Sequence, residues 1–325
     1  MCLPRWILAI SCTAVLCGET LPVPLGLDAY IPAPESNPLT REKAELGRAL
    51  FFFKGLSSDG TLACAGCHLP ERAFTDGKPR AIGVAEQTGP RRTPALVNRA
   101  WGKSFFWDGR AATLEDQVLQ PILNPAEMGM KVADIAHRVG ADVKLTATMK
   151  AVFGREPENE DIARALATYV RTILSGDSPY DRYVAGDRTA LTDEQQLGLK
   201  LFRGKANCIA CHVGTNLTDE RWHNTGSGWM NGKWTDEGRG AVSGAHDERG
   251  AFKTPGLREV ARAAPYMHDG SLATLEEVID FYDNGGRENP AIDPEMRKLN
   301  LTAVEKRALV EFLKSLSGKV SEGWR

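Results

Sequence analysis

Two short stretches of this sequence carry residues that can bind a redox cofactor. Residues 64–68 read CAGCH and residues 208–212 read CIACH, so both match the pattern CxxCH. In this pattern the two thiols form thioether bonds to a porphyrin, and the histidine becomes a ligand of its iron. We therefore expect two covalently bound haem c groups. They would be attached at Cys64 and Cys67 and at Cys208 and Cys211, with His68 and His212 as the iron ligands.

The other cysteines of the chain favour haem attachment over the alternatives. Of the seven cysteines, three stand near the N-terminus and the remaining four make up the two CxxCH pairs. Paired cysteines can also form a zinc site or a redox-active dithiol. A zinc site, however, does not need a histidine directly after each pair, so the repeated pattern favours two haems.

The N-terminus has the features of an export signal. Arg5 provides a positive charge, and an apolar run over residues 6–16 follows it. Such a run has the length of a signal-peptide core and is too short to span a bilayer comfortably. We expect residues 1–20 to be a signal peptide, with lipidation at Cys17 as a weaker alternative. Export to the periplasm agrees with covalent haem attachment, which takes place outside the cytoplasm, and no later apolar run is long enough for a membrane helix.

Composition restricts the class of protein further. The 325 residues are 42% hydrophobic and 25% charged, which is typical of a globular protein with room for two domains. The formal net charge is −2. Because the chain has no broad excess of basic residues, nucleic acid is a poor candidate partner.

Apolar spacing and capping residues predict a mainly α-helical protein. Threonine, which can accept a hydrogen bond from the first turn of a helix, stands at the start of most of the expected helices. Residues 69–100 and 213–252 have no clear period, and we expect long irregular loops there. Six helices are predicted. Two have only a predicted start, after Thr40 and at Thr192. The other four are predicted over Thr113 to Leu119, 159–175, Thr274 to about Tyr282, and Thr302 to near Gly318.

The sequence also repeats itself around the two CxxCH motifs. ELGRALF at residues 45–51 precedes the first motif, and QLGLKLF at residues 196–202 precedes the second. Downstream, residues 93–118 align without a gap with residues 254–279. A repeat of this kind predicts two similar units. We therefore expect two cytochrome c-like haem domains related by an internal repeat, with long irregular loops. The first would span residues 21–180 and the second residues 181–325.

The repeat also predicts how the two irons differ. Trp107 aligns with His268, and the residue fourteen positions later is Pro121 in the first unit and Tyr282 in the second. Tyrosine can bind ferric iron through its phenolate oxygen, whereas proline has no side-chain donor. We therefore expect an open first iron, which could bind peroxide, and a closed second iron, which would store and pass electrons. His268 and Met267 are the alternative sixth ligands of the second iron.

Around these residues the chain resembles the di-haem cytochrome c peroxidase superfamily and, within it, the MauG group. Residues 106–110 read FWDGR, Gln117 and Pro121 follow, and residues 124–128 read NPAEM, which matches the family pattern. Most bacterial di-haem peroxidases have a methionine where Tyr282 stands, and MauG-type proteins have a tyrosine. The resemblance covers nearly all of the chain after the signal peptide. It implies that the N-terminal domain is peroxidatic and that the C-terminal domain transfers electrons.

The resemblance also implies roles for three side chains. Glu127 and Gln117 would line the peroxide pocket, and Trp107 would lie between the haems and relay electrons. Cleavage of peroxide needs a base that moves a proton from one oxygen to the other, and a carboxylate can do so. An amide can hold peroxide by a hydrogen bond, and an indole can be oxidised. The alternative interpretations are a solvated loop carboxylate for Glu127 and plain core packing for Trp107. His223 would be a simple loop residue or would lie close to the second haem.

Two positions depart from the pattern of the wider family. Many di-haem peroxidases have a loop histidine that blocks the peroxidatic iron, and Val84 stands at that place here. We therefore expect an iron that is open while both haems are ferric. Family members commonly bind Ca²⁺ between the haems through an asparagine and backbone carbonyls. In this chain Arg92 stands at the position of the asparagine, and Ala263 and Pro265 stand at the carbonyl positions. Arginine offers no oxygen ligand, which argues against calcium, although a backbone oxygen could substitute.

The leading hypothesis is a periplasmic di-haem oxidoreductase of the MauG type. Hydrogen peroxide would react at the haem of His68, and a protein substrate would be oxidised at long range through Trp107 and the second haem. The resemblance suggests the precursor of methylamine dehydrogenase, in which MauG completes tryptophan tryptophylquinone. A small cytochrome c or a cupredoxin would be the redox partner. The alternatives are a cytochrome c peroxidase that removes hydrogen peroxide and a di-haem electron carrier without catalysis.

Overall fold

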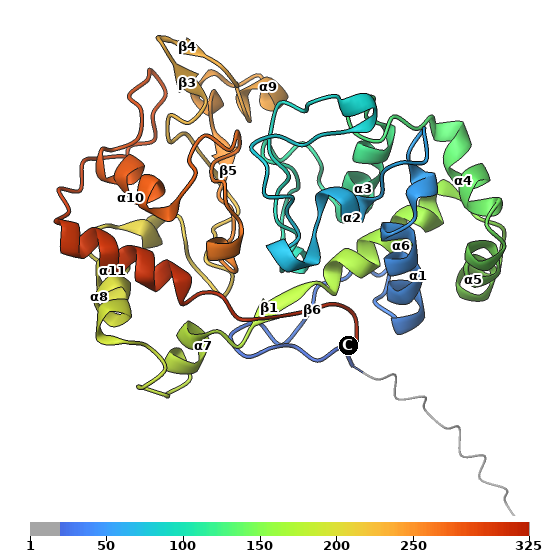
Figure 1. The fold of residues 1–325 in the computed structure, drawn as a ribbon, viewed down its shortest axis with the longest axis horizontal. Helices are drawn as coiled ribbons and strands as arrows, with labels where there is room; N and C mark the ends of the chain where they lie inside the picture. Colours follow the sequence, from blue (N-terminus) through green and yellow to red (C-terminus); the bar gives the residue numbers. More distant parts are fainter. Residues whose placement is uncertain (1–19, 325) are drawn as a thin grey trace, which may run out of the picture.

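The computed structural model describes residues 20–324. Within this range the chain folds into two mainly helical halves that lie next to each other (Figure 1). Among the described residues, no helix combines the length and the apolar character that crossing a membrane requires. The expected signal peptide, residues 1–20, falls outside the described residues except for its last position.

The first half is built on the helix pair α1 (Arg41–Phe51) and α6 (Asn159–Arg171). Thr40 caps α1 as expected, because its hydroxyl accepts a hydrogen bond from the Lys43 amide at 3.3 Å. The two helices approach most closely at Gly47, where a methyl group would overlap the carbonyl oxygen of Ala165. Buried apolar side chains of both helices contribute to the first core: Leu46, Leu50, Phe51, Ile162, Leu166 and Tyr169.

The second half repeats this arrangement with α8 (Asp193–Arg203) and α11 (Ala303–Lys314). Thr192 and Thr302 open these helices with capping boxes, as expected from the sequence. Gly198, the counterpart of Gly47, lies against the carbonyl of Ala308. The second core includes Leu199, Leu201, Phe202, Leu309, Phe312 and Leu313. The predicted mainly α-helical fold with an internal repeat is therefore confirmed.

A third pair of equivalent helices follows the aligned segments of the repeat. These are α3 (Leu114–Leu123) and α10 (Leu275–Asp283), capped by Thr113 and Thr274. Helix α3 was expected to end at Leu119, and this was wrong, because it continues through Pro121 to Leu123. The proline forfeits one helical hydrogen bond, but Ile122 is fully buried in the first core and holds the last turn in place.

The junction between the halves also differs from expectation. The helix predicted over 159–175 ends at Arg171, and Leu174–Gly176 forms strand β1. Strand β1 pairs antiparallel with β6 (Lys319–Ser321), so the C-terminal end of the chain returns to the first half (Figure 1). A pairing between segments so far apart leaves no local period in the sequence. Helix α7 (Pro179–Val184) spans residue 180, and the domain boundary expected there stays a prediction.

The remaining elements are short, and most lie in the two expected irregular regions. Helix α2 (Cys64–Cys67) is a single turn. Helices α4 (Val132–Gly140) and α5 (Val143–Phe153) pack beside the first core. Helix α5 was not predicted from the sequence. In the second half, β2 (Trp222–His223) pairs with β5 (Phe252–Lys253), and β3 (Trp229–Met230) pairs with β4 (Lys233–Trp234). Helix α9 (Gly240–Ser243) completes this region.

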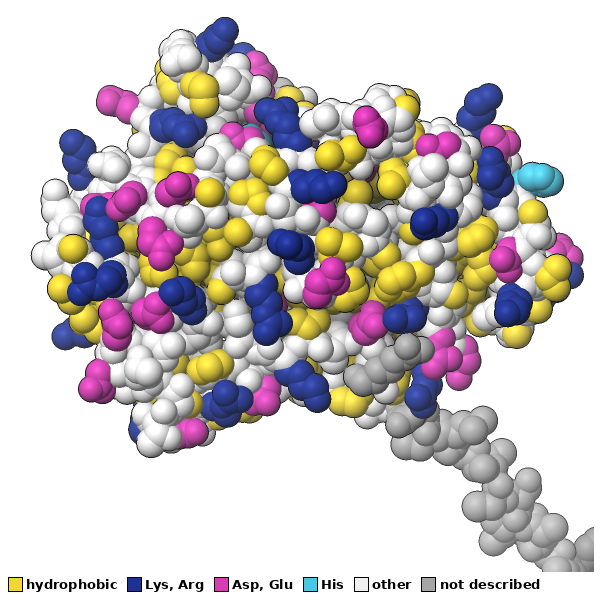
Figure 2. Space-filling view, in the orientation of Figure 1, with side chains coloured by type: hydrophobic (Ala, Val, Ile, Leu, Met, Phe, Trp, Pro, Cys, Tyr) yellow, Lys and Arg dark blue, Asp and Glu magenta, His cyan; other side chains and the backbone are white. Residues whose placement is uncertain are grey.

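The surface carries charges of both signs. Figure 2 shows lysine and arginine side chains interspersed with aspartate and glutamate over the visible face, and no broad patch of one sign covers it. This distribution agrees with the small net charge of the chain and gives a nucleic acid no extended basic surface on this face.

Candidate haem sites and peroxide pocket

The first CxxCH motif presents its histidine in the form that binds iron. The Nδ1 atom of His68 lies 2.8 Å from the carbonyl oxygen of Phe74 and donates its proton there, which leaves Nε2 free as a ligand. Helix α2 forms the turn that places both thiols, and the His68 amide donates to the carbonyl of Cys64 at 2.9 Å. Burial lowers the pKa of His68, so the imidazole stays neutral.

The second motif has the same local geometry. The Nδ1 atom of His212 lies 2.8 Å from the carbonyl oxygen of Leu217, and the His212 amide donates to Cys208 at 2.9 Å. The ring of Phe202 lies 6.4 Å from that of His212, and the equivalent ring of Phe51 lies 6.3 Å from that of His68. The repeat seen in the sequence therefore extends to the surroundings of both candidate ligands.

A cavity of about 540 Å³ opens beside His68. This volume lies in the range of about 300–1,000 Å³ that is usual for cofactor and small-molecule sites. The thiol-bearing Cys64 and Cys67 border the cavity together with His68, and apolar side chains make up much of the remaining wall. The residues present therefore fit a covalently attached haem. Part of the wall comes from the second half, so the cavity reaches the junction between the halves.

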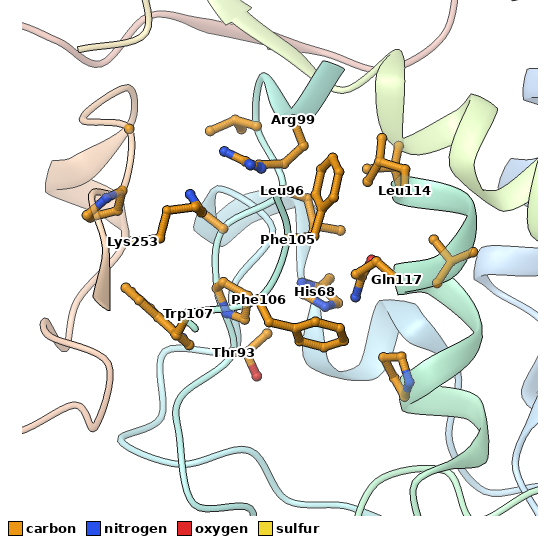
Figure 3. A pocket seen from close by; sticks show the side chains of 18 of the residues that line it. His68, Thr93, Leu96, Arg99, Phe105, Phe106, Trp107, Leu114, Gln117 and Lys253 are labelled. Carbon is orange, nitrogen blue, oxygen red and sulfur yellow. The ribbon is translucent and has the colours of Figure 1, made fainter. Parts of the chain in front are cut away.

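Three of the sequence-predicted residues meet on one side of this cavity. Gln117 and Pro121 reach it from α3, and Glu127 reaches it from the segment that follows the helix. Figure 3 shows Gln117 pointing from α3 toward His68. The Nδ2 atom of Asn124 donates to Glu127 Oε1 at 2.7 Å and holds the carboxylate in place. Burial raises the pKa of Glu127, and the Asn124 hydrogen bond and the charge of Arg110 act in the opposite direction.

The loop that contains Val84 packs on this same segment. The Val84 amide donates to the carbonyl of Glu127 at 2.8 Å, and at Gly83 a methyl group would overlap the carbonyl of Ala126. This contact brings Ile82 and Gly83 to the cavity wall. The side chain of Val84 is buried and has no donor atom that could bind iron.

Trp107 is held by both halves of the molecule. Its indole Nε1 donates to the carbonyl of Arg92 at 3.0 Å, and its own carbonyl accepts from the amide of Lys253, in β5, at 2.8 Å. Trp107 borders the cavity, and Figure 3 shows it on the side toward Lys253, away from Gln117. This placement puts an oxidisable ring where the two halves meet.

The structure also places the candidate ligands of the second iron. Tyr282 stands seven residues after the first residue of α10, and Pro121 stands seven residues after the first residue of α3. Helix α10 contributes Leu275 and Ile279 to the second core, against which Cys208 packs, so Tyr282 lies on a helix next to the second motif. Burial raises the pKa of Tyr282, and Cys208 and Cys211 act in the same direction.

Of the two competing ligands, His268 lies in other surroundings, and so does His223. His268 is stacked on Phe252 with ring centroids 3.7 Å apart, and its ring nitrogens face Ser227 at 3.4 Å and Asp236 at 3.6 Å. His223 lies between two carboxylates, with Nδ1 2.6 Å from Asp293 and Nε2 2.8 Å from Asp219. The Asp219 amide donates to the carbonyl of Cys211 at 2.9 Å, which places His223 next to the second motif.

One charged cluster at the cavity was not predicted from the sequence. Arg99 binds Glu220 through two contacts of 2.8 and 3.1 Å, and the ammonium of Lys253 lies 3.5 Å from the same carboxylate. Burial lowers the pKa of Lys253 to about 7. Two basic side chains thus share one carboxylate at the cavity wall, which suits a ligand that carries carboxylates, as haem does. The one sequence signal was the repeat, which aligns Lys253 with Arg92.

The position expected for calcium does not fit a calcium ion. The guanidinium Nη2 of Arg92 donates to the carbonyl oxygen of Ala263 at 2.6 Å. A cationic side chain therefore already binds one of the carbonyl oxygens that were expected as calcium ligands. Calcium needs several oxygen ligands, and its charge would be repelled by the guanidinium. The sequence-based argument against calcium at this position therefore agrees with the geometry.

Comparison with known proteins identifies the class to which this fold and these sites belong. Residues 41–189 match the family model described as di-haem cytochrome c peroxidase. The chain is 42% identical over 293 residues to the methylamine utilization protein MauG of Methylorubrum extorquens. This alignment covers 89% of this chain and 82% of that protein. The chain belongs to this family of di-haem peroxidases and MauG proteins. It is therefore a di-haem oxidoreductase, and the family implies two haem c cofactors.

Two further relatives show the range of this similarity. The chain is 34% identical to cytochrome-c peroxidase IdrP1 of Denitromonas iodatirespirans, over 95% of this chain and 91% of that protein. Among solved structures, a MauG-like protein associated with microbial copper homeostasis superposes with a TM-score of 0.84 at 37% identity. That match covers 90% of this chain and 95% of the solved one. Both enzyme types named in the sequence analysis thus occur among its relatives.

Proposed function

We propose that this protein is a periplasmic MauG-type oxidoreductase that uses hydrogen peroxide to oxidise a protein substrate at long range. The observation that carries the proposal is the difference between two equivalent positions. Pro121, which has no donor atom, borders the cavity of His68, whereas Tyr282 lies beside the second CxxCH motif. This difference favours one open and one closed iron, and it argues against an electron carrier with two closed irons.

The side chains around the cavity support the chemistry of the first step. When bound, haem supplies at His68 an iron that can bind and reduce hydrogen peroxide. Glu127 accepts a proton from one peroxide oxygen and delivers it to the other, and the Asn124 hydrogen bond keeps the carboxylate aimed at the cavity. Gln117 holds the peroxide by a hydrogen bond. Reduction of one peroxide to two waters consumes two protons and two electrons.

The electrons come from the protein substrate and cross the molecule. Trp107 carries them from the second half to the first, and its two hydrogen bonds hold the ring between the halves. Tyr282 would supply an oxygen ligand that stabilises the ferric state of the second iron. Because oxidation reaches the substrate by electron transfer, the substrate does not have to enter the cavity.

The names of the relatives support a proposal for the substrate class. One relative carries a name that refers to methylamine utilization, and a solved relative is associated with copper homeostasis. We propose a protein with an oxidisable aromatic side chain as the substrate, with the precursor of methylamine dehydrogenase as the first candidate. A small cytochrome c or a cupredoxin would exchange electrons with the enzyme.

A cytochrome c peroxidase is the second candidate, because relatives over most of the chain carry that name. The two candidates differ in the electron donor. Steady turnover of hydrogen peroxide with a reduced small cytochrome c, at rates well above those with a protein substrate, would favour the peroxidase.

The test of the leading proposal uses the diferric holoprotein that has never been reduced. We would record its optical and EPR spectra and then add one equivalent of hydrogen peroxide. One high-spin haem that reacts at once supports the open iron and the MauG-type mechanism. Two low-spin haems that react only after partial reduction would overturn it and indicate a reductively activated peroxidase.

A further inference from the structure

A matched pair of backbone hydrogen bonds joins the two halves at the cavity. Arg92 and Lys253 are equivalent residues of the repeat, since each directly precedes a Thr-Pro pair. The Arg92 amide donates to the carbonyl of His268 at 2.9 Å, and the Lys253 amide donates to the carbonyl of Trp107 at 2.8 Å. Trp107 and His268 are themselves equivalent, so each half binds the other in the same way.

Arg92 makes two further contacts at this junction, one within the first half and one across to the second. Its carbonyl accepts the indole N–H of Trp107 at 3.0 Å, and its guanidinium Nη2 donates to the carbonyl of Ala263 at 2.6 Å. One residue therefore binds Trp107 on one side and the second half on the other. A change in the position of Arg92 would move the Trp107 ring relative to both halves.

The charge of Arg92 has no carboxylate at salt-bridge distance among the described residues, although Asp76 is near enough to raise its pKa. Its side chain is buried, with 6% of the residue exposed, and its Nε atom has no hydrogen-bond acceptor among the described residues. It forms no salt bridge with any described carboxylate, and burial lowers its pKa to about 10. A buried charge without a salt bridge is costly for folding, and here the carbonyl of Ala263 is the hydrogen-bond acceptor of the guanidinium.

We propose that the guanidinium of Arg92 supplies the positive charge at the carbonyl of Ala263 that a divalent cation would otherwise supply, and that Arg92 positions Trp107 between the halves. A calcium ion would have to lie about 2.3–2.6 Å from its oxygen ligands. The guanidinium already lies at that distance from the Ala263 oxygen, and the two cations would repel each other. The enzyme therefore does not depend on calcium at this site.

The first test measures calcium directly in the diferric holoprotein. After dialysis against a chelator, we expect no stoichiometric calcium, and addition of calcium chloride should change neither the melting temperature nor the EPR spectrum. One calcium ion per chain, with a spectral change when it is removed, would overturn the proposal. This test needs no peroxide activity, so it stands even if the proposed function fails.

The second test replaces the guanidinium with an oxygen ligand for calcium. Arg92→Asn removes the guanidinium and offers an amide oxygen, so we expect calcium to raise the melting temperature of this variant by about 3 °C or more while the wild type does not respond. Arg92→Lys, which keeps a cation, is the matched control and should stay insensitive to calcium. An Arg92→Asn variant that calcium does not stabilise would show that this is not a cation position and would overturn the proposal.

The third test concerns the positioning of Trp107 and rests on the proposed function. In Arg92→Gln we expect the reaction of peroxide at the first haem to keep its rate, while oxidation of the second haem slows about tenfold or more. Arg92→Lys should recover most of this loss. If both rates fall together in Arg92→Gln, or neither changes, Arg92 has no positioning role for Trp107.

Discussion

At the scale of single residues, the chemistry of the first site depends on how Glu127 holds a proton. Burial raises the pKa of this carboxyl, whereas Asn124 and Arg110 limit the increase. A carboxylate with a raised pKa is a better proton acceptor than an exposed one. Pro121 and the buried Val84 bring no donor that could close the cavity. A base at Glu127 and an open position at the first iron are what the proposed activation of peroxide requires.

Replacement of Glu127 by glutamine tests the base. The amide keeps an acceptor for Asn124 but cannot take the proton, so we expect the rate of reaction with hydrogen peroxide to fall about 10²- to 10⁴-fold in stopped-flow measurements. The wild-type rate should fall as the pH drops through the raised pKa of Glu127, because the carboxylate becomes protonated, and Glu127→Gln should lack this step. Glu86→Gln, an exposed change in the neighbouring loop, is the control. A Glu127→Gln variant that reacts at the wild-type rate would exclude Glu127 as the base.

Replacement of Tyr282 by phenylalanine tests the closed iron. The ring keeps its packing against Phe281, but the oxygen ligand is lost, so a second high-spin ferric signal should appear in the EPR spectrum. Tyr183→Phe, which lies against the second core and bonds Gln196, should leave the spectrum unchanged. If Tyr282→Phe retains one low-spin haem with wild-type g values, another residue is the sixth ligand.

At the scale of elements, a pair of packed helices lies next to each haem motif. Helix α1 packs on α6 and helix α8 packs on α11, and the last residues of α1 and α8 bring Phe51 and Phe202 toward the candidate iron ligands. Close approach of each pair requires glycine at one position, because a methyl group would overlap a backbone carbonyl. A shift of either helix pair would therefore move an aromatic ring that lies near a candidate iron ligand.

Gly47→Ala measures this constraint. The added methyl group meets the Ala165 carbonyl and the Tyr169 side chain, so we expect a loss of about 1–3 kcal/mol of unfolding free energy. For a protein of this size the melting temperature should fall by roughly 1.5–4.5 °C, as scanning calorimetry can record. Gly140→Ala is the matched control, since a methyl group there meets no atom within 4 Å. Equal melting temperatures for both variants would show that α1 and α6 can separate without cost.

At the scale of the whole molecule, function depends on the junction between the halves. The cavity of His68 has walls from both halves, and Trp107 is bound by Arg92 from the first half and by Lys253 from the second. Strands β1 and β6 add a second connection, because the C-terminal strand returns to the first half. These contacts fix how the two sites lie relative to each other, and the proposed electron transfer between them depends on that placement.

Trp107→Phe tests communication through this junction. Phenylalanine keeps most of the packing but is much harder to oxidise and loses the hydrogen bond to Arg92. We expect peroxide to react at the first haem at an unchanged rate, while oxidation of the second haem and of a protein substrate slows by about tenfold or more in stopped-flow spectra. Trp229→Phe, in the β3–β4 hairpin against Trp234, should change neither rate. A Trp107→Phe variant with full communication would assign the relay to another group.

Much of the fold could be read from the sequence where the signal was local. Threonine caps marked the first residues of α1, α3, α8, α10 and α11, because a cap involves only the next three residues. Errors arose where distant packing overrode local preference. Helix α3 continues through Pro121 because Ile122 is buried in the core, and α6 ends at Arg171 because the next residues pair with β6.

The sequence by itself determined the two haem motifs, the repeat and the unequal pair Pro121 and Tyr282, since each depends on residue types at fixed spacing within one segment. Only the tertiary structure decided which charged groups meet at the junction. Arg99 and Glu220 are 121 positions apart in the sequence, and Arg92 reaches Ala263 across 171 positions. The relative placement of two packed halves sets such contacts, and no periodicity along the chain records it.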